Sequence, residues 1–194
     1  MFSAGRLDAE FVVNEYIAWL RGIQGKRDFV PLSKVVGQIG SGHTPYKHDI
    51  SQGDVGFITV ECVGPLYFAE EKLKRITQEQ FDDEFQTMRA VKGGVLCTIK
   101  RRICQAYPFF DTPSQPLAIN QDVALLIPNE GVRPGYLAAY LSSKIGQRFA
   151  DRQKTEQINP YISGANLRTL PITVLRHFQN PRKAGICLNI FDPF

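Results

Sequence analysis

The chain has 194 residues, of which 43% are hydrophobic and 22% are charged, and its formal net charge is +4. This length predicts one domain, or one domain with a helical appendage, and the composition excludes disordered, collagen-like and coiled-coil proteins. No apolar run approaches the roughly 18 residues of a membrane span, and the N-terminus lacks the apolar stretch of a signal peptide, so we expect a cytoplasmic protein with no membrane segment.

An amphipathic helix is predicted near the N-terminus. Apolar residues recur there at helical spacing, between acidic residues and two glycines, at Val13, Tyr16, Ile17, Leu20 and Ile23. We expect this helical lead-in, residues 1–25, to pack on the next domain or on a second copy of the chain. Its five apolar residues are then its most buried positions.

Residues 26–56 are rich in glycine, proline, histidine and serine. Pro31 is placed to open a short helix that continues through Val36, and a loop follows at 40–45. Strands are predicted farther along, separated by turn residues, at 56–62, 94–99, 103–109 and 122–127.

Two more helices are predicted in this part of the chain. A polar helix fits residues 77–86, between the first two predicted strands. The strongest helix follows Pro134, with apolar residues at Leu137, Tyr140, Leu141, Ile145 and Phe149. Residues 176–194 show neither helical nor strand periodicity, and we expect an irregular tail.

The sequence contains no convincing catalytic or metal-binding motif. Asp54 with Glu70 and Lys72 lacks the proline of the nuclease pattern that it partly matches, and Asn159-Pro160-Tyr161 lacks the second proline of a methyltransferase loop. His43 and His48 with Cys62 do not have the paired spacing of a zinc site. No two of the four cysteines form a C-x-x-C pair, which predicts reduced thiols. We therefore expect no catalytic residue, metal or cofactor.

Basic residues are distributed unevenly. From Lys144 onward there are eight basic and three acidic side chains, a net charge of +5. Before that point one basic run stands out, Lys100-Arg101-Arg102, between an apolar segment and the aromatic residues at 107–110. Such a loop either faces a negatively charged partner or is a solvated turn.

Several segments, taken in order, resemble the target-recognition domain of the DNA specificity subunits of type I restriction-modification systems. They are RLDAEF at 6–11, PLSKVV at 31–36, GSGHTP at 40–45, GDVGFI at 53–58, KGGVL at 92–96, INQD at 119–122, GYLAAYLSS at 135–143, and Ile162-Ser163 leading to LRTLPI at 167–172. The resemblance covers residues 6–175. It implies an α+β fold, with a mixed, strongly twisted, barrel-like sheet, peripheral helices and the N-terminal helix.

The resemblance also implies a function. Such a domain, here residues 26–175, has no chemistry of its own and recognises one half of a split target in duplex DNA. Its partners are the DNA methyltransferase (modification) subunit and the restriction subunit. The polar and basic loop residues are the candidates for DNA contact: Ser41, His43, Thr44, Tyr46, Lys47, Lys100, Arg101, Arg102 and Gln115. Ser41 and Thr44 could instead cap or complete a turn.

Two alternatives remain open at the level of sequence. The chain could be a protein-interaction or glycan-binding module without affinity for DNA, or a recognition-domain fragment of a fused methyltransferase-nuclease. Specificity subunits usually carry two recognition domains joined by long helices, and no helix is predicted after residue 172. The chain could therefore be a half-subunit, a truncated gene product or a domain cut from a larger enzyme. Because one domain reads only half of a split target, we expect half-subunit behaviour, as a homodimer or bound to a partner.

Overall fold

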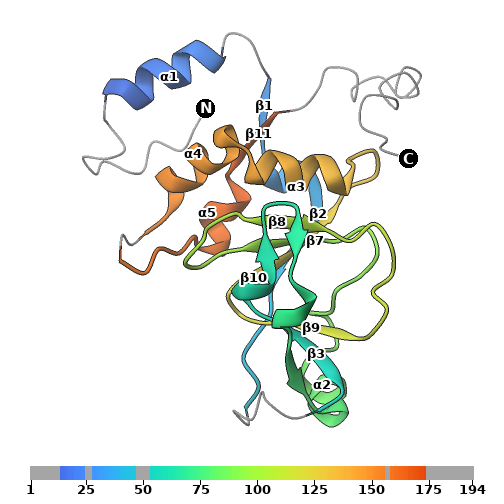
Figure 1. Cartoon of the computed structure of the whole chain (residues 1–194). Helices are drawn as coiled ribbons and strands as arrows, with labels where there is room; N and C mark the ends of the chain where they lie inside the picture. Colours follow the sequence, from blue (N-terminus) through green and yellow to red (C-terminus); the bar gives the residue numbers. More distant parts are fainter. Residues whose placement is uncertain (1–13, 25–27, 47–52, 156–157, 174–194) are drawn as a thin grey trace.

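The computed structural model describes residues 14–24, 28–46, 53–155 and 158–173 (Figure 1). The helices in this part of the chain are α1 (Asn14–Gln24), α2 (Gln78–Glu84), α3 (Pro134–Ser142), α4 (Lys144–Gln153) and α5 (Gly164–Arg168). Single 3-10 turns are η1 (Leu32–Lys34), η2 (Val60–Cys62) and η3 (Glu70–Lys72). The strands are β1 (Phe29–Pro31), β2 (Val36–Ser41), β3 (Val55–Ile58), β4 (Val63–Gly64), β5 (Tyr67–Phe68), β6 (Lys74–Ile76), β7 (Val95–Thr98), β8 (Ala106–Pro108), β9 (Leu117–Ile119), β10 (Val123–Pro128) and β11 (Pro171–Thr173).

Two small sheets form the centre of the fold. The first has the strand order β2-β10-β7-β8 and is antiparallel throughout. The second has the order β6-β3-β9, in which β3 runs antiparallel to β6 and parallel to β9. Strands β1 and β11 form a separate pair, and so do β4 and β5. The expected α+β class is therefore confirmed, with the strands divided among four small sheets.

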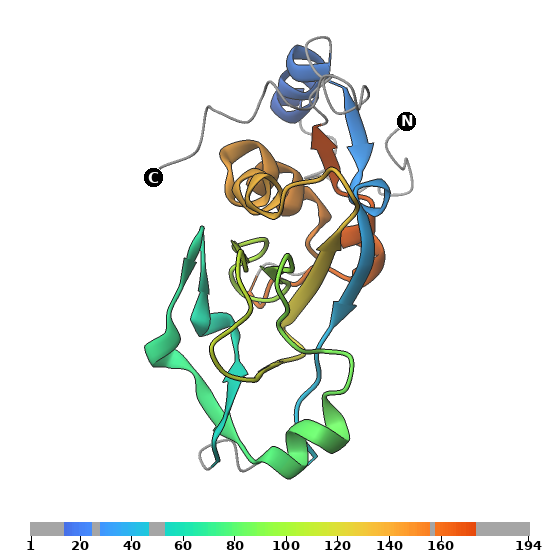
Figure 2. The same ribbon diagram turned by 90° about the vertical axis from the view of Figure 1, so that its right-hand side faces the viewer.

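The central strands send alternate side chains into different hydrophobic cores. In β10, Ala124 and Leu126 join a core that includes α3, α4 and α5, whereas Val123 and Leu125 join a second core with β3 and β9. This alternation follows from the two-residue period of a strand. A third core contains Phe81 of α2. The layers therefore follow in this order: the helices α3, α4 and α5, the sheet β2-β10-β7-β8, the sheet β6-β3-β9, and helix α2. Figures 1 and 2 show α2 at the opposite end of the molecule from α3 and α4.

The predicted N-terminal helix is present as α1 and packs on the domain. Tyr16 is buried, and Leu20 and Ile23 pack against the core beneath α3 and α4. Trp19 also contributes, since its ring lies 5.2 Å from that of Phe149, edge to face. Val13, the first residue of the predicted apolar set, lies outside the described residues. The prediction of an amphipathic helix that packs on the domain is confirmed.

Four details of the predicted secondary structure are wrong. The strand expected at 56–62 is β3, which ends at Ile58, and the turn η2 follows it at Val60–Cys62. The helix expected after Pro134 is two helices, because Ser143 adopts an extended backbone and accepts a hydrogen bond from the N–H of Gly146, which caps α4. The helix expected after Pro31 is the single turn η1, and strand β2 begins at Val36. The strand expected at 103–109 is only β8, since Cys104 has a left-handed backbone with φ of 57°.

Candidate nucleic-acid interface

The first predicted DNA-facing loop begins where β2 ends, and a glycine is required there. A Cβ atom on Gly42 would lie 1.6 Å from the carbonyl oxygen of Ile119, so only a glycine permits this approach of two backbones. Ser41, just before it, is exposed at the end of β2. The loop is therefore fixed against the end of β9.

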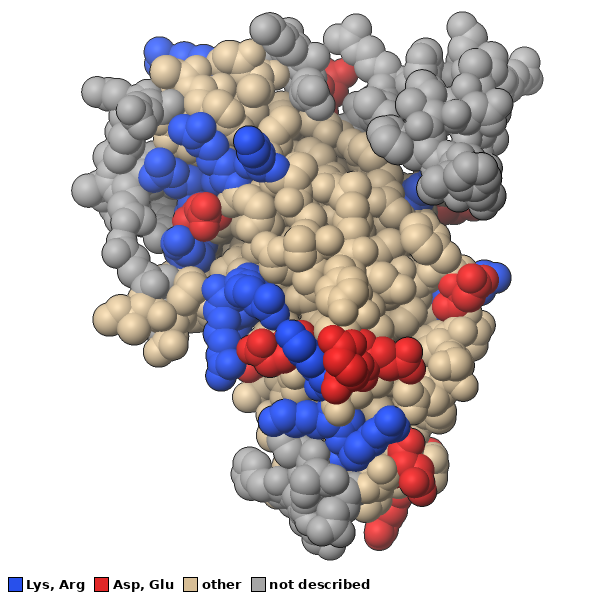
Figure 3. Space-filling model, viewed as in Figure 1, with Lys and Arg blue, Asp and Glu red and all other residues tan. Residues whose placement is uncertain are grey.

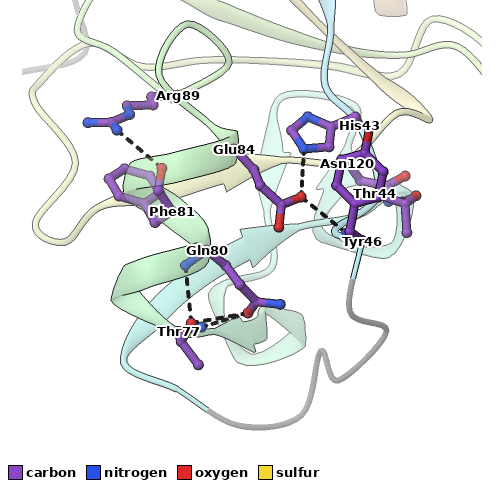
Figure 4. A network of polar contacts seen from close by, with 9 residues as sticks. All are labelled: His43, Thr44, Tyr46, Thr77, Gln80, Phe81, Glu84, Arg89 and Asn120. Atoms are coloured by element: carbon purple, nitrogen blue, oxygen red, sulfur yellow. Dashed lines mark hydrogen bonds and ion pairs between the residues drawn. The ribbon is translucent and has the colours of Figure 1, made fainter.

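Helix α2 holds the next residues of this loop (Figure 4). The ring of His43 stacks on Phe85, with centroids 4.2 Å apart and planes within 10° of parallel. Its Nε2 atom lies 3.1 Å from Oε2 of Glu84, and the same oxygen accepts a hydrogen bond of 3.1 Å from the backbone N–H of Tyr46. Glu84 stands at the end of a helix that begins with a capping box between Thr77 and Gln80. One carboxylate thus fixes both ends of the segment 43–46.

The turn between β9 and β10 connects this first loop to the second. On one side the amide of Asn120 donates to the Thr44 hydroxyl at 3.4 Å. On the other side Asp122 forms an ion pair of 2.7 Å with Lys100. The Asn120 side chain also accepts a hydrogen bond from the backbone N–H of Asp122, which closes the turn. The structure therefore brings the two predicted loops together through a segment, 120–122, that was not among the predicted site residues.

Acidic partners accompany the second loop. Arg101 and Arg102 lie 3.5 and 3.8 Å from the carboxylate oxygens of Glu61, and Arg102 also donates to the carbonyl of Val60 at 2.8 Å. Arg101 has a left-handed backbone, with φ of 62°, and its N–H donates to the carbonyl of Pro160. Each of the three cations in this loop therefore lies beside a carboxylate.

The remaining predicted site residues lie elsewhere or outside the described part. Gln115 belongs to a separate polar cluster, in which it accepts from Arg75 at 2.8 Å and donates to Glu70 at 3.1 Å. Lys47 lies outside the described residues, so the structure does not place it. Glu84, Asn120 and Asp122 were missed because their role depends on contacts with residues far away in the sequence.

Basic side chains also gather over α4. Figure 3 shows Lys and Arg along one side of this face, over α4 and below it near the loop that follows β7. The guanidinium groups of Arg148 and Arg152 stack over the rings of Trp19 and Tyr16, at 4.8 and 4.6 Å. Burial raises the pKa of Tyr16, although the two arginines act in the opposite direction. Stacking uses the guanidinium face and leaves N–H groups at its edge for other contacts.

The described thiols are buried, and two of them have a raised pKa. Cys62, Cys97 and Cys104 are free and buried. A hydrogen bond with Cys97, together with burial, raises the pKa of Cys104 well above its ordinary value, and burial raises the pKa of Cys62. Since the thiolate is the reactive form, Cys62 and Cys104 are poor nucleophiles and poor metal ligands.

Two further classes of site were sought in the described ranges. Nowhere in them do three or more His, Cys, Asp or Glu side chains gather in a way that could hold a metal ion. None of the described helices has the length and apolar character needed to cross a bilayer.

Known proteins resemble this chain in structure rather than in sequence. No protein-family model matches it. No curated protein sequence matches it either. The HsdS subunit from Thermoanaerobacter tengcongensis has a similar fold, with a TM-score of 0.50 and 16% identity over 81% of this chain. A structure concerning the complex assembly and conformational transition of the type I R-M system gives a TM-score of 0.52, also with 16% identity over 81% of this chain.

This chain has the fold of part of a type I specificity subunit. It spans 35% and 36% of those two solved chains. The S subunit of the type I restriction-modification system from M. genitalium is a weaker match, with a TM-score of 0.47 and 14% identity over 76% of this chain and 35% of that one. The expected resemblance to a type I specificity subunit is confirmed at the level of the fold.

Proposed function

We propose that this chain is a sequence-specific DNA-recognition domain of a type I restriction-modification system. It reads one half of a split target in duplex DNA and directs a DNA methyltransferase subunit, and with it a restriction subunit, to that site. It performs no catalysis itself and needs no cofactor. The recognition domain corresponds to residues 26–175, with 1–25 as a helical lead-in and 176–194 as a tail. Because its ligand is DNA, we place it in the cytoplasm.

The fold similarity to specificity subunits is the observation that carries this proposal. The two tethered loops supply a physical reason for it. DNA-reading proteins use polar side chains on rigid supports to contact base edges, and cations to contact phosphates. Both kinds of side chain occur here on loops that the turn 120–122 holds together.

A homodimer is the simplest way for such a domain to read a complete split target. One domain contacts one half-site, and two-fold symmetry supplies the second. A domain of this kind contacts only one half-site, so the other half-site needs a second recognition domain. We therefore propose that it functions as a pair.

Selection from a pool of duplexes with randomised centres tests the proposal directly. The protein should enrich one short sequence, and binding to that duplex should fall steeply with salt, because neutralised phosphates release counterions. A scrambled duplex of the same composition is the control. No enrichment, together with salt-independent binding to a protein or a glycan, would refute the proposal. Binding of S-adenosylmethionine in calorimetry would indicate the fused-enzyme alternative.

A further inference from the structure

Tyr46 combines a fixed backbone with a free side chain. Its ring is 90% exposed, although large apolar side chains are usually at least partly covered. Its own N–H is nevertheless bound to Glu84, and the residue before it, Pro45, is buried. The molecule therefore presents an aromatic ring to solvent from a well-defined position.

The residues 42–44, which precede Pro45 and Tyr46, are also held by contacts with other segments. The backbone of Gly42 packs closely against the carbonyl of Ile119, the ring of His43 stacks on Phe85, and the hydroxyl of Thr44 accepts a hydrogen bond from Asn120. None of these contacts involves the Tyr46 ring. They order the backbone that carries the ring, which lowers the entropy that a partner must remove on binding.

We propose that Tyr46 stacks on a base of the bound duplex and that Glu84 is the residue that positions it. This inference rests on the proposed function and names a contact within it. In a duplex both faces of a base are covered by its neighbours, so the ring enters one base step as a wedge and stacks on the base that it uncovers. A phosphate contact would use the hydroxyl group, which Tyr46→Phe removes, whereas base stacking uses the ring, which Tyr46→Phe keeps.

The electrostatics of the segment are compatible with approaching DNA. Glu84 is the nearest carboxylate in the described contacts, but its side chain is only 17% exposed and its Oε2 atom faces two nitrogen atoms, His43 Nε2 and the Tyr46 N–H. It is therefore largely shielded from phosphates.

Another exposed tyrosine provides a matched control. Tyr67 is 56% exposed, but its hydroxyl bonds to Glu71 at 3.4 Å, and it lies on the β4–β5 hairpin rather than on this loop. On α2, Asp83 is an exposed acidic neighbour of Glu84. These two positions control for the loss of an aromatic ring and for the loss of a charge.

The test uses the full chain and the duplex enriched by the selection described above. Tyr46→Ala should weaken binding about 5- to 150-fold, the usual effect of removing one base-stacking ring, whereas Tyr46→Phe should bind like the wild type. The salt dependence should stay unchanged in Tyr46→Ala, because no phosphate contact is lost. Tyr67→Ala and Asp83→Ala should also bind like the wild type.

Glu84 is tested through its dependence on Tyr46. Glu84→Ala should weaken binding, and Glu84→Gln, which keeps an oxygen acceptor for the Tyr46 N–H, should restore most of it. In a Tyr46→Ala background, Glu84→Ala should have little further effect, because the ring that it positions is absent. A merely structural role would give the same loss in both backgrounds.

A fluorescent base reports the contact itself. In duplexes with 2-aminopurine placed at successive positions, wild type should change the fluorescence at one step, and Tyr46→Ala should abolish that change. If Tyr46→Ala and wild type bind with equal affinity, the inference is overturned and the proposed function still stands. The same holds if Tyr46→Ala binds more weakly and also melts at a lower temperature than wild type. If wild type enriches no duplex, the proposed function fails and the inference fails with it.

Discussion

The loop 100–102 contains three adjacent cations, and the structure predicts that two of them respond very differently to substitution. Lys100 Nζ lies 2.7 Å from Asp122, and the two side chains are 44% and 22% exposed. Arg101 lies 3.5 Å from Glu61, with side chains 66% and 55% exposed. We expect Lys100→Gln to lower stability and Arg101→Gln to lower affinity for DNA.

The stability change of Lys100→Gln follows from its partner. Asp122 Oδ1 is buried, so the loss of Lys100 leaves a carboxylate oxygen with no cation beside it, which costs about 1–2 kcal/mol once the partial exposure of the pair is allowed for. For a domain of this size the melting temperature should fall by roughly 2–8 °C. Adding Asp122→Asn should recover part of the loss, because no unpaired carboxylate then remains.

Arg101→Gln should leave stability almost unchanged. An exposed ion pair contributes at most about 1 kcal/mol, and glutamine adopts the left-handed backbone of this position no less readily than arginine, so we expect a change within about 0.5 kcal/mol. If Arg101 contacts one phosphate, the slope of log affinity against log salt should shrink by about 0.9. Lys100→Gln should keep the wild-type slope, because its charge is already paired with Asp122.

Thermal melting and fluorescence anisotropy over a salt series measure the two effects on the same samples. The reasoning is refuted if Lys100→Gln lowers the salt slope at wild-type stability, since the ion pair with Asp122 would then be dispensable and Lys100 would be the phosphate contact. It is equally refuted if Arg101→Gln melts early with an unchanged slope. Arg102, which is tied to Val60 and Glu61, should be intermediate.

Two further predictions concern stability. Gly42→Ala should lower the free energy of unfolding by at least about 2 kcal/mol in urea, because its Cβ would collide with the backbone of Ile119. In Gly22→Ala, within α1, the new Cβ meets open space, and the free energy of unfolding should rise by roughly 0.5–1 kcal/mol. Equal stability of the two variants would contradict the packing argument. The raised pKa of Cys104 means that the folded state keeps a proton that the unfolded state loses, so stability should be intact below the ordinary thiol pKa and fall as pH rises from there toward the folded-state pKa. Cys104→Ser, whose hydroxyl does not titrate in this range, should show a smaller fall, and an identical pH profile would exclude Cys104 as its source.

Elements set by local chemistry were predictable from the sequence. Helix α2 has its signal within one turn, since Thr77 and Gln80 bond to each other's backbone N–H groups. Strand β10 is a continuous apolar run, as expected for a strand with cores on both faces. Strand β2, in contrast, contains two glycines and owes its existence to pairing with β10, more than eighty residues later. The break at Ser143 was hidden because the apolar period continues through Ile145 and Phe149.

The candidate site was predictable only in part, for the same reason. Loop composition indicated Thr44 and Lys100 as candidates for DNA contact, and the structure places both beside the turn 120–122. Nothing local indicated that Asn120 and Asp122 would bind them from a third segment. Glu84 lies 41 residues from His43, and no spacing rule relates an acid on one helix to a distant loop. The residue type of a side chain that contacts a ligand suggests its role. The role of a residue that positions such a side chain becomes visible only from its place in the fold.

The charge of the second loop also differs from what three consecutive cations suggest. Glu61 and Asp122, from two other segments, approach the run and reduce its net charge to +1. A strongly positive loop would bind any duplex, because phosphate attraction carries no sequence information. A rigid loop that is nearly neutral contributes less to non-specific binding, and its remaining donors can discriminate between bases. This balance favours selectivity over affinity, which is the property that a recognition domain requires when it must find one site among many competing ones.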